Sequence, residues 1–191
     1  MRGIKHTNGK NTRTNMIYNL LNTDHSLLKY ECTSFDFNNP EIDPQEFADN
    51  LKESMIEHRG VGLSACQVGF PWRVFAVGDP NDPDNIVVMF NPRIVDTSEQ
   101  MVLMEEGCLS YPGVFIKIKR PEQIRIRFSD AAGNTTTRVY DGIPARVIQH
   151  EYDHMDGITF HSRASSFHLD QAKRQKKKLD KIRKRNYNKA K

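Results

Sequence analysis

The chain has 191 residues, which is enough for one domain with a substantial hydrophobic core and short for two. Hydrophobic residues make up 37% of it, and no apolar run approaches the length of a membrane-spanning helix, which excludes an integral membrane protein. The net charge of +4 is unevenly spread: residues 173–191 carry eleven Lys or Arg and one Asp, a net of +10, which leaves −6 for residues 1–172. We therefore expect an anionic partner to contact the C-terminus rather than the body.

The N-terminal sequence and the cysteine content indicate where in the cell the protein resides. Residues 1–15 are polar and basic and lack the hydrophobic stretch of a secretory signal. We expect them to be a disordered leader or an over-called start, with translation beginning at Met16; an organelle address is the alternative. The cysteines, Cys32, Cys66 and Cys108, are odd in number and show no C-x-x-C spacing. This pattern favours a reducing, cytoplasmic location, in a bacterium or the host of a phage, over a disulfide framework.

The first predicted helix begins at Asp43, a good N-cap that is followed by Pro44, and ends near His58. Residues 60–69 then form a glycine-rich stretch, which we interpret as a loop that brings the backbone close to another group. The stretch lacks the third glycine of G-x-G-x-x-G, and no Lys-Ser/Thr pair follows it. A nucleotide-binding loop is therefore rejected.

Short apolar runs bounded by Gly, Asp, Asn and Pro predict strands at 74–77 and 86–90, with 93–96 and 101–104 continuing the sheet. Residues 114–118 and 124–128 alternate apolar and basic residues, and a turn at 131–134 leads into 135–140. These three segments predict an antiparallel meander that is buried on one face. Two further helices are expected, one from residues 141–144 to about Gly157 and a long one from Ser165 or Ser166 onward.

These elements predict an α+β fold. Antiparallel β-sheets would pack around a central helix that bears an H-E-x-x-H sequence, with an N-terminal helix and a basic C-terminal helix outside. We divide the chain into a leader (1–15), a catalytic domain (16–164) and a basic C-terminal helix or tail (165–191).

The H-E-x-x-H sequence is formed by His150, Glu151 and His154. Residues four apart lie on one face of a helix, so the two imidazoles can reach one divalent metal ion. Glu151 projects beside them, close enough to act on a water molecule without ligating the metal. The alternative is a helix with exposed polar residues and no metal.

Two histidines leave a metal under-coordinated, so a third ligand is needed. His161 and His168 lie downstream but do not fit the spacing of zinc proteases. Cys108 lies 42 residues before His150, beside a glycine at an expected strand-to-turn break. A thiolate there would complete a Cys-His-His set with a fourth position open. A buried structural cysteine is the alternative.

Three segments in order resemble the motifs of the peptide deformylase family. Residues 60–67 (GVGLSACQ), 106–110 (EGCLS) and 149–157 (QHEYDHMDG) are similar to G-x-G-L-A-A-x-Q, E-G-C-L-S and Q-H-E-x-D-H-L-x-G. Ser64 stands where the family usually has Ala, and Met155 where it has Leu; we interpret both as packing changes.

The resemblance implies a metal-dependent hydrolase that removes the N-formyl group from the N-terminal formylmethionine of nascent polypeptides and releases formate. It implies three metal ligands, Cys108, His150 and His154. It makes Glu151 the general base and acid, and it assigns stabilisation of the oxyanion to the Gln67 amide and the Leu109 N–H. The family's metal is ferrous iron in the cell, with nickel, cobalt or zinc able to occupy the site.

The resemblance and the helix positions also suggest substrate contacts. The methionine slot and the binding edge for the extended peptide would use Val61, Gly62, Met104, Tyr111, Gly113, Ile143, Arg146 (through its stem) and Val147. The peptide would add as a strand near 60–62 and 111–113.

Two rival functions stay open at this point. A zinc endopeptidase shares H-E-x-x-H, although Cys108 and Gln67 argue against it. A non-catalytic RNA-binding module would use the basic tail, although Glu151 and the full ligand set argue for retained catalysis. The tail itself, residues 173–191, would either dock on ribosomal RNA or be a solvated helix face.

Overall fold

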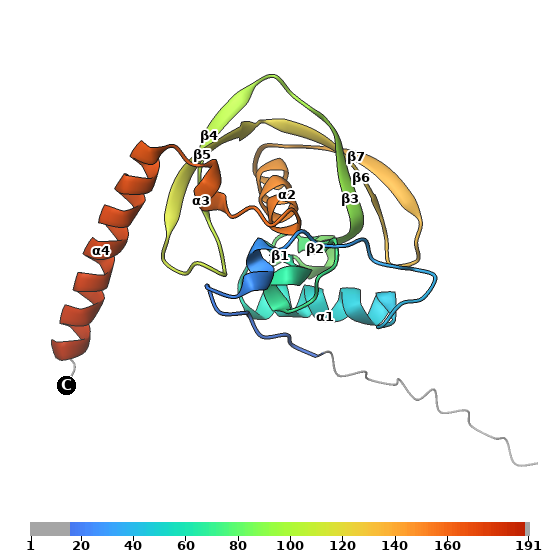
Figure 1. Cartoon of the computed structure of the whole chain (residues 1–191), viewed down its shortest axis with the longest axis horizontal. Helices are drawn as coiled ribbons and strands as arrows, with labels where there is room; N and C mark the ends of the chain where they lie inside the picture. The colour runs from blue at the N-terminus through green and yellow to red at the C-terminus, as the bar shows by residue number, and fades with distance from the viewer. Residues whose placement is uncertain (1–15, 190–191) are drawn as a thin grey trace, which may run out of the picture.

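The computed structural model describes residues 16–189 and has an α+β fold with antiparallel sheets and four α-helices in that part of the chain (Figure 1). The prediction for residues 1–15 lies outside the described residues. The first α-helix, α1, spans Pro44–Glu57. It begins as predicted, because Asp43 accepts a hydrogen bond from the Glu46 N–H at 2.9 Å and Pro44 occupies the first turn.

The larger sheet has five antiparallel strands in the order β1-β2-β3-β6-β7. Their bounds are β1 Gly62–Ser64, β2 Val74–Val77, β3 Val87–Thr97, β6 Gln123–Ser129 and β7 Thr135–Asp141. The predicted strands 86–90 and 93–96 are a single strand, β3, whose irregular pairing with β6 allows the chain to bend without ending the strand. The glycine-rich stretch is not a loop throughout, since it contains β1 and the 3-10 helix η2 (Ala65–Val68).

The smaller sheet pairs β4 (Met101–Gly107) with β5 (Phe115–Pro121). The predicted meander is therefore wrong at its first strand, and 101–104 do not continue the larger sheet. The reason is that both edges of β6 are occupied, by β3 and by β7, so β5 has no place beside it. The predicted alternation along β5 is confirmed, because Ile116 and Ile118 are buried while Lys117 and Lys119 are exposed.

Helix α2 (Gly142–Met155) lies beneath the arch of strands in Figure 1. The short strands β1 and β2 separate it from α1, as the alternation along β2 shows: Val74 and Ala76 belong to the hydrophobic cluster that includes α1, whereas Phe75 and Val77 belong to the cluster that includes α2. The pair β1–β2 thus packs against α1 on one face and against α2 on the other, which holds the backbone of β1 next to α2.

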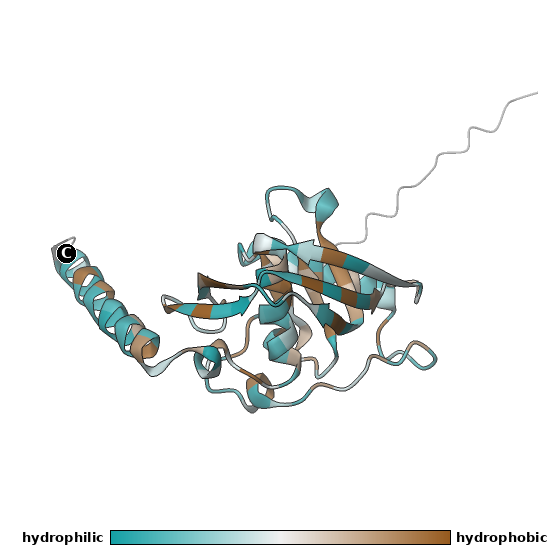
Figure 2. Cartoon of the chain, turned by 90° about the horizontal axis from the view of Figure 1, so that it is seen from above, coloured by the Kyte–Doolittle hydropathy of each residue, from teal (hydrophilic) through white to brown (hydrophobic). Residues whose placement is uncertain are grey.

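The C-terminal part comprises the short helix α3 (Phe160–Arg163), which was not predicted, and the long helix α4 (Ser166–Lys189). The first turns of α4 pack on β5 through Ala172 and Leu169, in a cluster with Phe160. The rest of α4 extends away from the sheets and is mainly hydrophilic (Figure 2). Two 3-10 helices, η1 (Ser26–Lys29) and η3 (Pro83–Asn85), complete the described elements. No described helix is both long and apolar enough to cross a membrane.

Candidate metal centre

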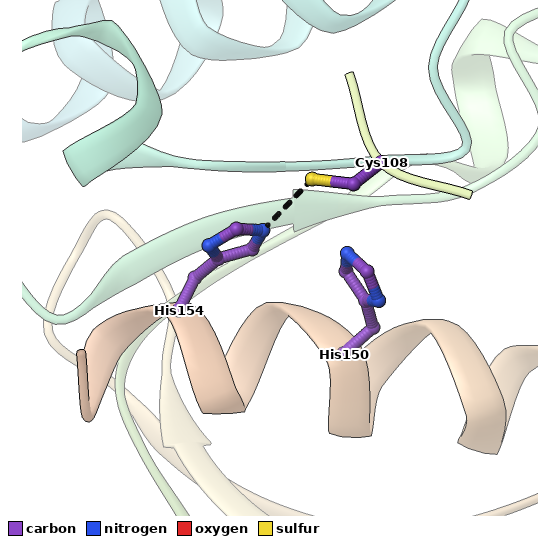
Figure 3. Close-up of side chains that lie close together, drawn as sticks. All are labelled: Cys108, His150 and His154. Atoms are coloured by element: carbon purple, nitrogen blue, oxygen red, sulfur yellow. Dashed lines mark hydrogen bonds between the residues drawn. The ribbon is translucent and has the colours of Figure 1, made fainter. Parts of the chain in front are cut away.

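Cys108, His150 and His154 converge at the inner end of the small sheet (Figure 3). One possible ligand atom from each residue lies within 4.8 Å of the others, and the Cys108 Sγ is 3.2 Å from the His154 Nε2. Both histidines are buried, at 7% and 1% exposure, whereas Cys108 is half-buried. The sequence prediction that an upstream cysteine meets the two α2 histidines is thus matched by the geometry.

Local structure explains why Cys108 points at α2. Strand β4 ends at Gly107, and the Phe115 ring of β5 occupies the space that a side chain at this position would take, 2.8 Å from where its Cβ would lie. The chain then turns, with the Tyr111 N–H donating to the Cys108 carbonyl at 3.0 Å. This turn directs the thiol inward from the strand end.

Glu106 orients the first histidine. Its Oε2 lies 2.9 Å from the His150 Nδ1, which leaves the His150 Nε2 as the ring nitrogen that faces the site. Burial of Glu106 acts to raise its pKa, but hydrogen bonds from His150, Arg120 and Arg146 outweigh this and lower the pKa to about 2. Glu106 is therefore an anion that accepts hydrogen bonds from His150 and from two arginines.

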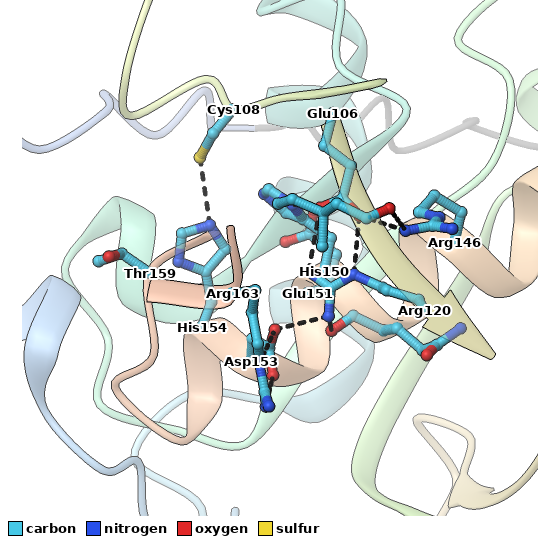
Figure 4. Close-up of polar contacts among 12 residues, drawn as sticks. Glu106, Cys108, Arg120, Arg146, His150, Glu151, Asp153, His154, Thr159 and Arg163 are labelled. Atoms are coloured by element: carbon cyan, nitrogen blue, oxygen red, sulfur yellow. Dashed lines mark hydrogen bonds and ion pairs between the residues drawn. The ribbon is translucent and has the colours of Figure 1, made fainter. Parts of the chain in front are cut away.

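The same carboxylate belongs to a buried ionic network that joins the small sheet to α2 and α3 (Figure 4). Arg120 on β5 forms ion pairs with Glu106 at 2.7 Å and with Asp153 at 2.6 Å. Arg163 on α3 also pairs with Asp153, at 2.6 Å. No role for Arg120, Asp153 or Arg163 was predicted from the sequence. One signal was available, because the alternation along β5 places Arg120 on the buried face, and a buried guanidinium requires acidic partners.

The surroundings of the two histidines shift their pKa values in opposite directions. Burial acts to lower the pKa of His150, but hydrogen bonds with Cys108 and Glu106 outweigh it and raise this pKa to about 10. Burial and the charges of His150 and Arg120 lower the pKa of His154 to about 3. One thiolate and two imidazoles suit a borderline-soft divalent ion.

Glu151 lies beside the histidines on α2 and is 4% exposed. Its Oε2 accepts a hydrogen bond from the Ser64 Oγ at 2.7 Å. Its Oε1 lies against Gly62, where a Cβ would approach to 2.4 Å. This is the close backbone approach expected for the glycine-rich stretch. Burial raises the pKa of Glu151 above its usual value, which suits a group that must gain and lose a proton.

Gln67 lies on η2, and Leu109 directly follows Cys108 in the turn after β4. The Gln67 Oε1 accepts from the Ser64 N–H at 2.8 Å, so the amide is oriented with its Nε2 as the donor toward the site. That Nε2 is 3.0 Å from the Ser110 Oγ and 3.6 Å from the Cys108 Sγ. Within the described residues the Leu109 N–H donates to no protein acceptor, and the Leu109 side chain lies against Gly60.

The residues proposed for substrate binding are spread more widely. Val147 lies next to Gly62 and Glu151, within 2.8 Å of the position that a Gly62 Cβ would take. Val61 and Ile143 are largely exposed, at 52% and 69%. Gly113 has a left-handed φ of 75°, in the turn that follows Cys108.

Three further members of that set lie toward the small sheet. Met104 is half-buried on β4, opposite Ile118. The Tyr111 ring packs edge-on against His161, with centroids 4.7 Å apart. The Arg146 guanidinium is bound to Glu106 and to the Val102 carbonyl, so only its stem remains for other contacts.

Comparison with known proteins resolves the choice among metal-dependent hydrolases. Residues 17–170 match the family model of polypeptide deformylase. The chain belongs to the peptide deformylase family. As such it is a metal-dependent hydrolase that removes the N-formyl group from nascent polypeptides.

Relatives with known names support this assignment. The peptide deformylase of Thermotoga neapolitana is 38% identical over 110 residues, which are 58% of this chain and 65% of that protein. The peptide deformylase of Fusobacterium nucleatum is 34% identical over 145 residues, 76% of this chain and 82% of that protein. The Met-Ala-Ser-bound class I type b peptide deformylase of Acinetobacter baumannii has a TM-score of 0.72 and 34% identity, and the match covers 78% of this chain and 99% of that one.

Proposed function

We propose that Cys108, His150 and His154 hold the divalent metal of this deformylase and that Glu151 is its general base and acid. The observation that carries the proposal is the convergence of the three ligand atoms within 4.8 Å, with Glu151 adjacent on the same helix. The soft thiolate favours ferrous iron in the cell over harder ions, with nickel, cobalt or zinc as substitutes in purified protein. The cytoplasm, where nascent chains emerge from ribosomes, is the location that accords with this activity.

A divalent ion in this site would act as a Lewis acid that activates water and polarises the formyl carbonyl. Glu151 accepts the proton of the attacking water and later delivers it to the departing amine, so that formate leaves. Its buried carboxylate, which has a raised pKa, is suited to both transfers. Because Glu151 follows His150 directly on α2, the base is positioned by the same helix as two of the ligands.

Negative charge that develops on the formyl oxygen is received by the Gln67 Nε2 and the Leu109 N–H. The Gln67 amide is already oriented by the Ser64 N–H, so little reorganisation is needed when the charge develops. One donor of this kind is typically worth about 3–4 kcal/mol of transition-state stabilisation.

The methionine side chain of the substrate would lie against the apolar wall of α2, where Ile143 and Val147 are one turn apart. Val61, Met104 and the stem of Arg146 would complete this slot. The peptide backbone would run between Gly62 and the turn that contains Tyr111 and Gly113. The relative bound to Met-Ala-Ser supports this assignment, because that peptide begins with methionine.

The direct test of the catalytic assignment is Glu151→Ala in metal-loaded protein, assayed by formate release from a formyl-Met peptide. We expect activity to fall by roughly a thousandfold with metal content retained. Full activity in this variant would overturn the assigned mechanism. Offering an internal peptide beside the formyl peptide tests the endopeptidase alternative, since only the second should be cleaved.

We also propose that the chain is divided functionally into a catalytic body, residues 16–164, and a C-terminal helix that docks on ribosomal RNA. The support is the exposed, lysine-rich surface of α4 beyond its contact with β5, because phosphate contacts by Lys and Arg give salt-dependent affinity. Replacing Lys177, Lys181 and Lys184 by Ala should weaken ribosome co-sedimentation more at 50 mM than at 200 mM salt, because the lost phosphate contacts contribute most affinity at low salt.

The matched control for this docking test is the replacement of Lys117 and Lys119 on β5, two exposed lysines of the body, by Ala. If the α4 variant sediments with ribosomes as well as the control does, the basic surface is only a solvated helix face.

A further inference from the structure

Ser64 contacts both side chains to which we assign proton transfer and oxyanion binding. It is the last residue of β1 and is completely buried. Its backbone N–H donates to the Gln67 Oε1 at 2.8 Å. Its hydroxyl lies 2.7 Å from the Glu151 Oε2 and 3.1 Å from the Glu151 backbone carbonyl oxygen. A single residue therefore relates the two halves of the site to each other.

The orientation of the Glu151 carboxylate depends on few contacts. Within the described residues, the hydrogen bond from Ser64 is the one that its carboxylate accepts. Gly62 and Val147 limit the space around Oε1 without bonding to it. A hydroxyl that donates to one oxygen of a carboxylate restricts the rotation of the whole group, so that the other oxygen keeps one orientation in the site.

We propose that Ser64 is a positioning residue for deformylation, whose hydroxyl fixes the Glu151 carboxylate with Oε1 free to exchange the proton. The proposal rests on the role of Glu151 as general base. Proton transfer requires a base within hydrogen-bonding reach of the water, so a carboxylate free to rotate spends part of its time in unproductive orientations. The effect of Ser64 is therefore on turnover rather than on binding of the peptide.

The two contacts of Ser64 can be separated experimentally. Ser64→Ala removes the hydroxyl but keeps the backbone N–H that orients Gln67. We expect kcat on a formyl-Met peptide to fall about tenfold, the loss of one hydrogen bond to a charged group, with KM unchanged. Metal content should equal that of the parent protein. Ser64→Thr retains the hydroxyl and should recover most of the lost kcat.

A double-mutant cycle identifies the partner through which Ser64 acts. In Glu151→Asp, the carboxylate is one methylene shorter and cannot keep the same contact with Ser64. Adding Ser64→Ala to that variant should therefore lower kcat by less than twofold, because interacting residues are not additive. A full tenfold loss in the Glu151→Asp background would show that Ser64 does not act through Glu151 and would overturn the proposal.

Ser54→Ala is the matched control. Ser54 is also completely buried, and its hydroxyl donates to the Asn50 carbonyl at 2.6 Å and accepts from the Tyr18 N–H at 2.8 Å, away from the site. This control should lower Tm without lowering kcat. An unchanged kcat in Ser64→Ala, or an equal loss in Ser54→Ala, would overturn the proposal. An active Glu151→Ala would instead refute the underlying assignment of the base, so the two failures are distinguishable.

Discussion

The interface between the small sheet and α2 uses charged residues in the opposite way from α4. In the interface, Arg120 and Arg146 are 5% and 6% exposed and are bound to Glu106, with Asp153 as a further partner of Arg120. On the described part of α4, the one ion pair joins Lys173 to Asp170 at 3.9 Å, and both side chains are exposed. Charge that is paired and buried defines the orientation of neighbouring groups, whereas unpaired surface charge contributes little to folding.

The largest loss of activity is expected at the proposed metal centre, which lies where the small sheet meets α2. Cys108→Ala removes the one thiol ligand, so formate release should fall by roughly a thousandfold or more. Metal content per chain, measured on anaerobically purified protein, should fall with it. Cys32→Ala, which removes a buried thiol from the hydrophobic core, is the control and should retain the metal. A Cys108→Ala protein that holds metal as tightly as the parent would contradict the ligand assignment.

The next effect is on stability within the interface. Glu106→Ala leaves buried guanidiniums without their shared anion, and breaking such a pair typically costs about 3–5 kcal/mol of unfolding free energy. It also removes the acceptor of the His150 Nδ1 hydrogen bond, so metal affinity should fall. Glu105→Ala, one residue earlier on the exposed face of β4, should change neither quantity. Urea denaturation of both variants measures the difference, and equal stabilities would refute the structural role of the network.

A smaller effect is expected where the network reaches the surface. Arg163→Ala removes two hydrogen bonds to Asp153, at 2.6 and 3.1 Å, but the Arg163 side chain is 47% exposed. Solvent screening reduces the contribution of such a pair to about 1 kcal/mol or less. Asp153 keeps Arg120 as a partner, so kcat should stay close to that of the parent. A loss of stability as large as that of Glu106→Ala would mean that the burial of an ion pair does not determine how much it contributes to the free energy of unfolding.

The smallest effect is expected on α4. Replacing Lys177, Lys181 and Lys184 together by Ala should leave Tm and the turnover of a short formyl-Met peptide unchanged, because these side chains are exposed and form no ion pair within the described part of the chain. Thermal unfolding and formate release measure this directly. A drop in either would indicate that α4 supports the fold of the body and would weaken the contrast with the interface.

Much of this architecture follows from local sequence signals. Asp43 and Pro44 predict the start of α1, and the spacing of His150 and His154 predicts their common face. The glycine next to Cys108 marks the end of β4. The partner of β5 was not predictable in this way, because strand pairing depends on which edges remain free once β3, β6 and β7 have assembled. The alternation of apolar and polar residues along a strand predicts which face is buried, but it does not predict which strand pairs with it.

The contacts that complete the site also escaped sequence reasoning, for a related reason. Ser64 was interpreted as a packing change, yet its hydroxyl bonds Glu151, 87 residues later. Glu106 was quoted only as part of a motif, although it binds His150 and two arginines. Such pairs are created when distant elements pack, and a residue type that suits both packing and hydrogen bonding carries no local sign of which it does.

The proposed ligands are divided between the turn that follows β4 and helix α2, and this division has a consequence for the order in which the molecule folds. Cys108 leaves the ribosome well before His150 and His154. Arg163, which pairs with Asp153 of α2, leaves later still. If Cys108 and the two histidines bind the metal, the full donor set forms only after the small sheet has docked on α2, so metal capture would be one of the last events of folding rather than a nucleus for it. The enzyme that trims new chains must itself be nearly complete before it can acquire the ion it needs.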